Sequence, residues 1–211
     1  MTHPALPGAV ELLARSLAYL DRALAGIDIA AGHLWAPTPC ARWDLARLLS
    51  HLEDSLDAFT EAATGSLDVR RASRPRAGPG GPSVAAVRAK AAALSSAWTV
   101  PGPGRIEVGR SVMAAPLLVA TAALEVAVHG WDVHRATGAD VRIPADLAAS
   151  QLALARGVIR PSDRHGRFGP ALETPGSPAA DELLLAFLGR VPAAADTRPR
   201  FWEPVGVRAV G

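Results

Sequence analysis

Cysteine, lysine and aromatic residues are scarce in this chain of 211 residues. Cys40 is its only cysteine, so no disulfide can form within the chain, and a secreted fold held by disulfides is excluded. Aromatic residues make up 5% of the chain while Ala and Leu are abundant, which favours helices packed through small and aliphatic side chains over a β-sheet. Lys90 is its only lysine, and this preference for arginine points to a GC-rich, actinobacterial source.

Continuous hydrophobic runs and concentrated charge are missing as well. The longest apolar stretch, residues 112–128, is interrupted by Pro116, Thr121 and Glu125 and is short for a membrane span. The first 16 residues lack the charged start and the apolar core of a signal peptide. The formal net charge is +2, with no Lys/Arg cluster typical of nucleic-acid binding. We therefore expect a soluble cytoplasmic protein, a monomer or a homodimer, that binds neither nucleic acid nor a membrane.

Apolar residues that recur three and four positions apart predict four long helices. Asp44 precedes the second helix and Ser83 the third, and both side chains can accept hydrogen bonds from the free N–H groups of a first helical turn. Gly65 and Gly138 mark the ends of the second and fourth helices. The predicted helices run over residues 8–24, from residue 45 toward Gly65, and over residues 84–98 and 115–137.

Shorter elements complete the prediction. Residues 105–110 favour a short extended piece, and residues 145–158 and 179–188 favour two short helices separated by a loop rich in Pro and Gly. The four long helices have the number and length of a helical bundle. We therefore predict an all-α fold in two parts: a bundle over residues 1–140, and a C-terminal helical segment and tail over residues 141–211 that packs on it.

Glu125 and His129 lie four residues apart in the fourth predicted helix, in the stretch LEVAVHGWDVHRATG. Residues with this spacing project from one helix face, so a carboxylate oxygen and an imidazole nitrogen can reach a common point about 2 Å from each. A third ligand has to come from another helix. His51, at the edge of the apolar stripe of the second helix, is the best candidate. The three side chains predict a site for one divalent cation.

The apolar surroundings of Glu125 give a physical reason for a cation. Ala122, Leu124 and Val126 are its neighbours, and a carboxylate taken out of water is destabilised by several kcal/mol unless a positive charge balances it. An arginine partner would balance the charge as well as a metal ion would. Because Glu-x-x-x-His also occurs in many helices by chance, the spacing alone leaves both alternatives open.

Two separated stretches resemble the mycothiol-dependent maleylpyruvate isomerase family of the DinB superfamily. PTPCARWDLARLLSHLEDSLDAF resembles its opening helical segment, and ALEVAVHGWDVHRATG is similar to its second metal motif. RHGRFGPALETPGSPAADELLLAFLGRVP resembles the C-terminal part of actinobacterial members described as metal-binding proteins. The resemblance covers most of residues 38–192. It implies a DinB-like four-helix bundle with additional short C-terminal helices, in which His51, Glu125 and His129 bind the metal.

The resemblance also implies a reaction. Three protein ligands leave one coordination position open, as in catalytic rather than structural zinc sites. In the family this position is associated with mycothiol, a low-molecular-weight thiol, or with water. A thiol bound to Zn²⁺ loses its proton near neutral pH, and the thiolate can add to an electrophilic carbon. We therefore expect a metal-dependent thiol S-transferase or isomerase that acts on a small electrophilic substrate.

Two other functions stay open at this point. A thiol-independent tailoring enzyme or hydrolase of secondary metabolism would use the metal to activate water, and a non-catalytic protein would only bind it. Zinc suits two imidazoles and one carboxylate, although Ni²⁺, Fe²⁺ and Mn²⁺ accept the same ligands. The C-terminal part is shorter than in a full-length isomerase, which argues against maleylpyruvate itself as the substrate.

Polar residues near these motifs complete the set of candidates. Asp132, three residues after His129, is either a hydrogen-bond partner of that imidazole or a surface residue. His134 lies roughly 140° around the helix from His129 and is expected to face away. Cys40 is expected to be a packed or loop cysteine without a catalytic role. The polar side chains of residues 164–167 are expected in a solvated loop.

Overall fold

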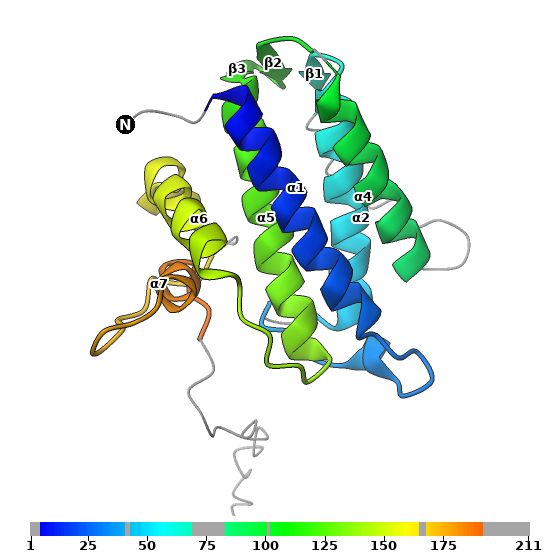
Figure 1. Ribbon diagram of the computed structural model, residues 1–211, viewed down its shortest axis with the longest axis vertical. Helices are drawn as coiled ribbons and strands as arrows, with labels where there is room; N and C mark the ends of the chain where they lie inside the picture. Colours follow the sequence, from blue (N-terminus) through cyan, green and yellow to red (C-terminus); the bar gives the residue numbers. More distant parts are fainter. Residues whose placement is uncertain (1–4, 41–42, 69–82, 101, 165–167, 192–211) are drawn as a thin grey trace, which may run out of the picture.

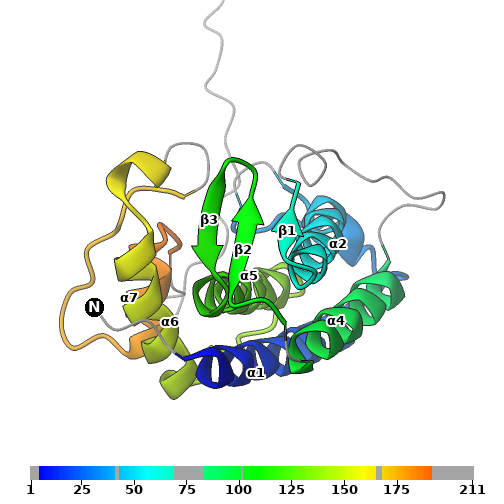
Figure 2. The same cartoon turned by 90° about the horizontal axis from the view of Figure 1, so that it is seen from above.

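Four long helices lie side by side and form the body of the protein (Figures 1 and 2). The computed structural model describes residues 5–40, 43–68, 83–100, 102–164 and 168–191. The apolar faces of the four helices meet in one core, so the predicted all-α fold is confirmed. The bundle consists of α1 (Leu6–Ala25), α2 (Leu45–Ala62), α4 (Val84–Thr99) and α5 (Ala115–Ala136).

The helix ends follow the signals in the sequence. The carboxylate of Asp44 accepts a hydrogen bond from the backbone N–H of Arg47 at 2.8 Å, and the hydroxyl of Ser83 accepts one from Ala86 at 3.0 Å. Gly138, just after α5, has φ +75°, a left-handed conformation that ends a helix and that suits glycine because it has no Cβ. The predicted long helices are therefore confirmed, with ends shifted by one or two residues.

One end of the bundle carries a small sheet (Figure 1). β1 (Ser66–Leu67) pairs in parallel with β2 (Arg105–Val108), and β2 pairs antiparallel with β3 (Ser111–Ala114). The sequence predicts a single extended piece at residues 105–110 and misses β3. Gly109, with φ +59°, begins a tight turn, and the chain then returns as β3 and enters α5 directly.

Two shorter helices pack beside the bundle (Figure 1). They are α6 (Ala145–Val158) and α7 (Ala180–Phe187), close to the predicted ranges. Their leucines form a second core together with Tyr19 of α1 and Trp131 of α5. The C-terminal segment thus packs against the two helices α1 and α5, while the predicted tail beyond residue 191 lies outside the described residues.

α1 and α5 approach each other closely at Gly130. A Cβ added to Gly130 would lie 3.0 Å from the ring of Tyr19 and 3.3 Å from the backbone Cα of Leu20. The Tyr19 ring is fully buried and its hydroxyl donates a hydrogen bond to the carbonyl of Val141, so this ring is held in place. Because Gly130 directly follows His129, the close contact with α1 fixes the part of α5 that carries the predicted ligands.

Gly130→Val is expected to lower the free energy of unfolding by about 2–3 kcal/mol, because its branched side chain overfills this contact. Urea denaturation measures the change. Gly8→Val on α1 is the matched control: a Cβ there meets nothing within 4 Å, so the expected change is below about 0.5 kcal/mol. A Gly130→Val protein as stable as the unmodified one would contradict the tight packing of α1 on α5.

α5 is the helix, among the described residues, that is long and apolar enough to cross a membrane by composition. Of its most apolar window, 78% is buried inside the protein. The central helix of a soluble bundle has this character, because it packs against neighbours on nearly all sides. The apolar composition of α5 is therefore explained by its place in the core.

Candidate metal centre

The three predicted ligands converge between α2 and α5. His51 stands on α2, Glu125 and His129 stand one turn apart on α5, and one ligand atom from each lies within 4.8 Å of the others. Oε1 of Glu125 lies 2.7 Å from Nε2 of His51 and 3.2 Å from Nε2 of His129. The two imidazole rings meet edge to face, with centroids 5.0 Å apart. Two imidazoles and one carboxylate thus face a common point.

This group of donors is accessible from one side. The side chains of His51 and Glu125 are 34% and 31% exposed, whereas that of His129 is 9% exposed. The ring of Trp43 packs against His51 with ring centroids 5.0 Å apart, so an aromatic side chain lies beside the more exposed of the two imidazoles. A small molecule can therefore approach His51 and Glu125 from solvent while His129 is anchored in the interior.

The negative charge of Glu125 is paired with imidazole groups. Within the described part of the chain, its ion pairs are with His51 and His129 rather than with an arginine or lysine. The hydroxyl of Ser55 adds a hydrogen bond to Oε1 at 3.4 Å. Burial by itself raises the pKa of Glu125, but the charge of His129 and the hydrogen bonds of both imidazoles hold this pKa well below its usual range. The carboxylate is thus ionised and faces nitrogen atoms that can bind a cation.

The other ring nitrogen of His129 faces a second carboxylate. Nδ1 of His129 lies 2.8 Å from Oδ2 of Asp132, which is fully buried. Burial lowers the pKa of His129, but the charge of Glu125 and the hydrogen bond to Asp132 raise it well above its ordinary value. An imidazole whose Nδ1 donates to a carboxylate presents the lone pair of Nε2 to a cation, as in many metal-bound histidines. A proton and a cation are therefore alternatives at Nε2 of His129.

Asp132 is in turn paired with Arg190, which follows α7. Nε of Arg190 donates to Oδ1 of Asp132 at 2.9 Å, and a terminal guanidinium nitrogen donates to Oδ2 at 2.7 Å. Burial raises the pKa of Asp132, but Arg190 and His129 more than offset this and hold the pKa well below its usual range. Asp132 therefore stays ionised and accepts from both partners, and the alternative that it is a surface residue is wrong.

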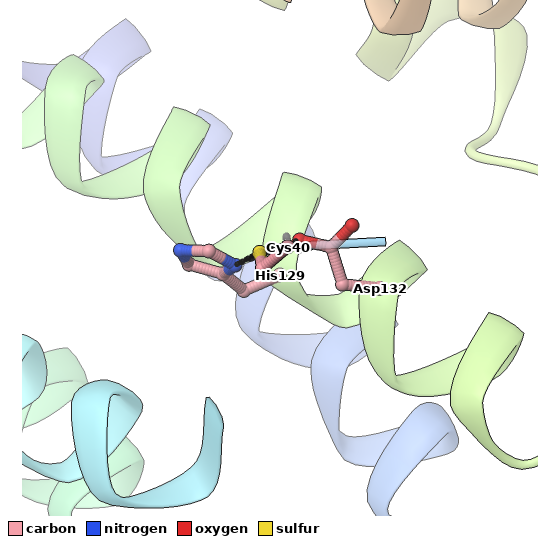
Figure 3. A group of neighbouring side chains, drawn as sticks. All are labelled: Cys40, His129 and Asp132. Atoms are coloured by element: carbon pink, nitrogen blue, oxygen red, sulfur yellow. Dashed lines mark hydrogen bonds and ion pairs between the residues drawn. The ribbon is translucent and has the colours of Figure 1, made fainter. Parts of the chain in front are cut away.

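Cys40 lies beside this pair, on the segment that precedes α2. Its Sγ is 3.2 Å from Oδ2 of Asp132 and 3.9 Å from Nδ1 of His129 (Figure 3). The guanidinium group of Arg190 also reaches the sulfur, at 3.6 Å. Cys40, His129 and Asp132 form a second group of possible metal donors. The described residues thus hold donor atoms suited to a divalent cation on both sides of one imidazole ring.

His134 and Arg164 each have defined partners in the structure. His134 is buried, faces Tyr19 with ring centroids 5.3 Å apart, and takes no part in either donor group, so the prediction that it faces away is confirmed. The prediction of a solvated loop is wrong for Arg164, whose guanidinium donates to the carbonyls of Gly169 and Phe187. Residues 165–167 lie outside the described residues.

Sequence reasoning missed two contributors to the centre. Ser55 lies four residues after His51 on α2, and this spacing alone could have indicated that both face the same way. Arg190 lies 58 residues after Asp132 and carries no motif, so no signal in the sequence indicated their pairing.

The bundle has an all-α, DinB-like fold in which two helices bring two imidazoles and a carboxylate, donors that could hold a metal ion, to one accessible point. Residues 13–134 match the mycothiol maleylpyruvate isomerase N-terminal domain family. This match covers more than half of the 211 residues and includes His51, Glu125 and His129, so the chain belongs to that family. The helices α6 and α7 and residue Arg190 lie beyond the matched residues.

Two curated relatives are similar over most of their length. Both are uncharacterized proteins of Mycobacterium tuberculosis, one from strain CDC 1551 / Oshkosh and one from strain ATCC 25618 / H37Rv. Each is 28% identical to this chain over 176 residues, which covers 77% of this chain and 88% of the relative. No solved structure gives a significant match.

Proposed function

We propose that this protein binds one divalent cation through His51, Glu125 and His129 and acts as a metal-dependent thiol S-transferase or isomerase. Its thiol is mycothiol, and its substrate is a small electrophile. The observation that carries the proposal is the convergence of the three donors at a point that solvent reaches from one side. Membership in the mycothiol maleylpyruvate isomerase N-terminal domain family supports the thiol.

The donor chemistry supports zinc as the cation. Two imidazole nitrogens and one carboxylate oxygen are ligands that zinc accepts, and catalytic zinc sites keep a further position for substrate or water. A bound zinc ion would lower the pKa of a thiol that coordinates it, so that the thiolate forms near neutral pH. The protein's own donors carry a single negative charge, that of Glu125, so the loaded centre keeps a net positive charge that favours an anionic ligand.

The burial of the three ligands determines the side from which the thiol and the electrophile approach the metal centre. His129 is anchored inside the bundle, so the approach has to be from the side of His51 and Glu125. Trp43 packs against His51, and we propose that the part of its ring not covered by Arg47 offers an apolar surface to a small substrate. The carboxylate of Glu125 faces the nitrogen atoms of both imidazoles, so its proposed role is to bind the cation rather than to deliver a proton.

Removal and return of the metal tests the proposal. Protein treated with a chelator and then reloaded with one equivalent of zinc is incubated with mycothiol and a panel of activated alkenes and epoxides. Mass spectrometry and chromatography are expected to detect thiol adducts or geometric isomers when both zinc and mycothiol are present. Products that form equally without the thiol would favour the hydrolase or tailoring enzyme. Tight zinc binding with no product and no affinity for mycothiol would favour a non-catalytic protein.

A further inference from the structure

The geometry points to Asp132 and Arg190 as positioning residues of the metal centre: through Asp132, Arg190 determines which nitrogen of His129 faces the cation. The C-terminal segment that follows α7 would then complete a centre whose proposed ligands all lie in the bundle. This inference rests on the proposed function only in requiring that a cation binds at His51, Glu125 and His129.

His129 is shared by two groups of donors. Its Nε2 faces Glu125 and thereby the group that includes His51, and its Nδ1 faces Asp132 and Cys40. The two nitrogens lie on different sides of the ring, so a cation that uses one group leaves the other nitrogen to a proton. Residues around His129 must therefore determine which of the two donor groups binds the cation.

Arg190 determines the binding site because its positive charge occupies the group formed by Cys40, His129 and Asp132. Its guanidinium lies 2.7 Å from Oδ2 of Asp132 and 3.6 Å from Sγ of Cys40, two of the three donor atoms of the second group. The side chain of Arg190 is 10% exposed and that of Asp132 is fully buried, so water screens this charge poorly. A divalent cation is repelled there, and the ionised Asp132 is left to accept the Nδ1 proton of His129. Nε2 is then the nitrogen available to a cation.

The end of α7 sets the place of Arg190. Gly189 has φ +75°, its N–H donates to the carbonyl of Ala186 at 3.0 Å, and the N–H of Arg190 donates to that of Leu185 at 2.8 Å. These two bonds form the helix-ending motif that typically requires glycine. Gly189 also packs against the backbone of Gly169, because a Cβ added to Gly189 would lie 2.5 Å from the Cα of Gly169. The backbone conformation at Gly189 therefore holds Arg190 where its guanidinium group contacts Asp132.

A buried ion pair can also serve stability alone, and the experiment has to separate the two roles. The variants are Asp132→Leu, Arg190→Met and the double variant, which replaces both charged groups by apolar side chains of similar size. Arg142→Met, which breaks a more exposed arginine–aspartate pair away from the centre, is the control. Arg142 pairs with both carboxylate oxygens of Asp181, at 2.6 and 2.7 Å, and contacts none of the donors. Each folded variant is titrated with Co²⁺, and nitrogen-resolved NMR of the zinc-loaded protein reports which nitrogen of His129 is protonated.

The affinity for Co²⁺ is expected to fall about 100-fold in Asp132→Leu and about 10-fold in Arg190→Met, the range typical for residues that orient a metal ligand. The double variant is expected to match Asp132→Leu, because Arg190 acts through Asp132, and Arg142→Met is expected to match the unmodified protein. The NMR of the unmodified zinc-loaded protein should place the proton on Nδ1 of His129. A mixture of ring states is expected when Asp132 is replaced.

Unchanged affinity in the folded double variant, or an equal loss in Arg142→Met, would overturn the positioning role. A thiolate-to-cobalt absorption band in the unmodified protein would also overturn it, since the cation would then bind Cys40. Failure of the unmodified protein to bind Co²⁺ or zinc at all would instead refute the proposed function itself. The two failures are therefore distinguishable.

Discussion

Glu125→Gln is expected to lower the affinity for zinc by at least about 100-fold, more than the loss typical for a residue that only orients a ligand. The amide keeps the size of the side chain, but it removes the negative charge that faces both imidazoles. Without that charge, the cation would bind to two neutral imidazoles alone, at a point that water reaches. A competition titration with a coloured chelator measures the affinity, and elemental analysis measures the metal content of the purified protein.

Glu53→Gln on α2 is the matched control for this prediction. Glu53 is a partly buried carboxylate like Glu125, but its ion pair is with Lys90 at 3.4 Å. Its substitution is expected to leave the zinc affinity unchanged. If Glu125→Gln retained the metal content and affinity of the unmodified protein, the donor group formed by His51, Glu125 and His129 would not be the metal site.

Asp132→Leu is expected to lower the free energy of unfolding by about 3–5 kcal/mol, because it leaves the buried guanidinium of Arg190 without a counter-charge. Replacing both members of a buried ion pair by apolar groups is often far less harmful than removing one. The double variant Asp132→Leu/Arg190→Met is therefore expected to regain at least about half of this loss. Urea denaturation of chelator-treated protein measures both values without a contribution from bound metal.

The double variant distinguishes stability from metal binding. It should recover much of the stability and none of the zinc affinity, because His129 still lacks its acceptor at Nδ1. A double variant no more stable than Asp132→Leu would show that the uncompensated charge of Arg190 is not what destabilises the protein.

The helices could be predicted because their signals are local. Asp44 and Ser83 cap the helices that follow them through bonds to backbone N–H groups only three residues away. Gly138 ends α5 through its own φ angle. Of the hairpin formed by β2 and β3, the sequence predicted β2 and missed β3, because two short strands at the end of a bundle show too little periodicity to be recognised.

The candidate site was predictable to the extent that it lies on helix faces. Glu125 and His129 share a face of α5 through their spacing alone, while the choice of His51 rested on its place at the edge of the apolar stripe of α2 and on the family resemblance. The role of Asp132 stayed open, since its spacing is the same for a residue in the interior and for one on the surface. Burial and the approach of Arg190 decided between them.

By itself, the amino-acid sequence determined the helical class, the caps and the pair of potential ligands on one turn of α5, because these depend on residues within a few positions of one another. The tertiary structure decided which residues meet across the fold: His51 with Glu125, Cys40 with Asp132, and Arg190 with both of the latter. Such contacts depend on how whole helices pack, and nothing in the local pattern around Arg190 records that the end of α7 lies against α5.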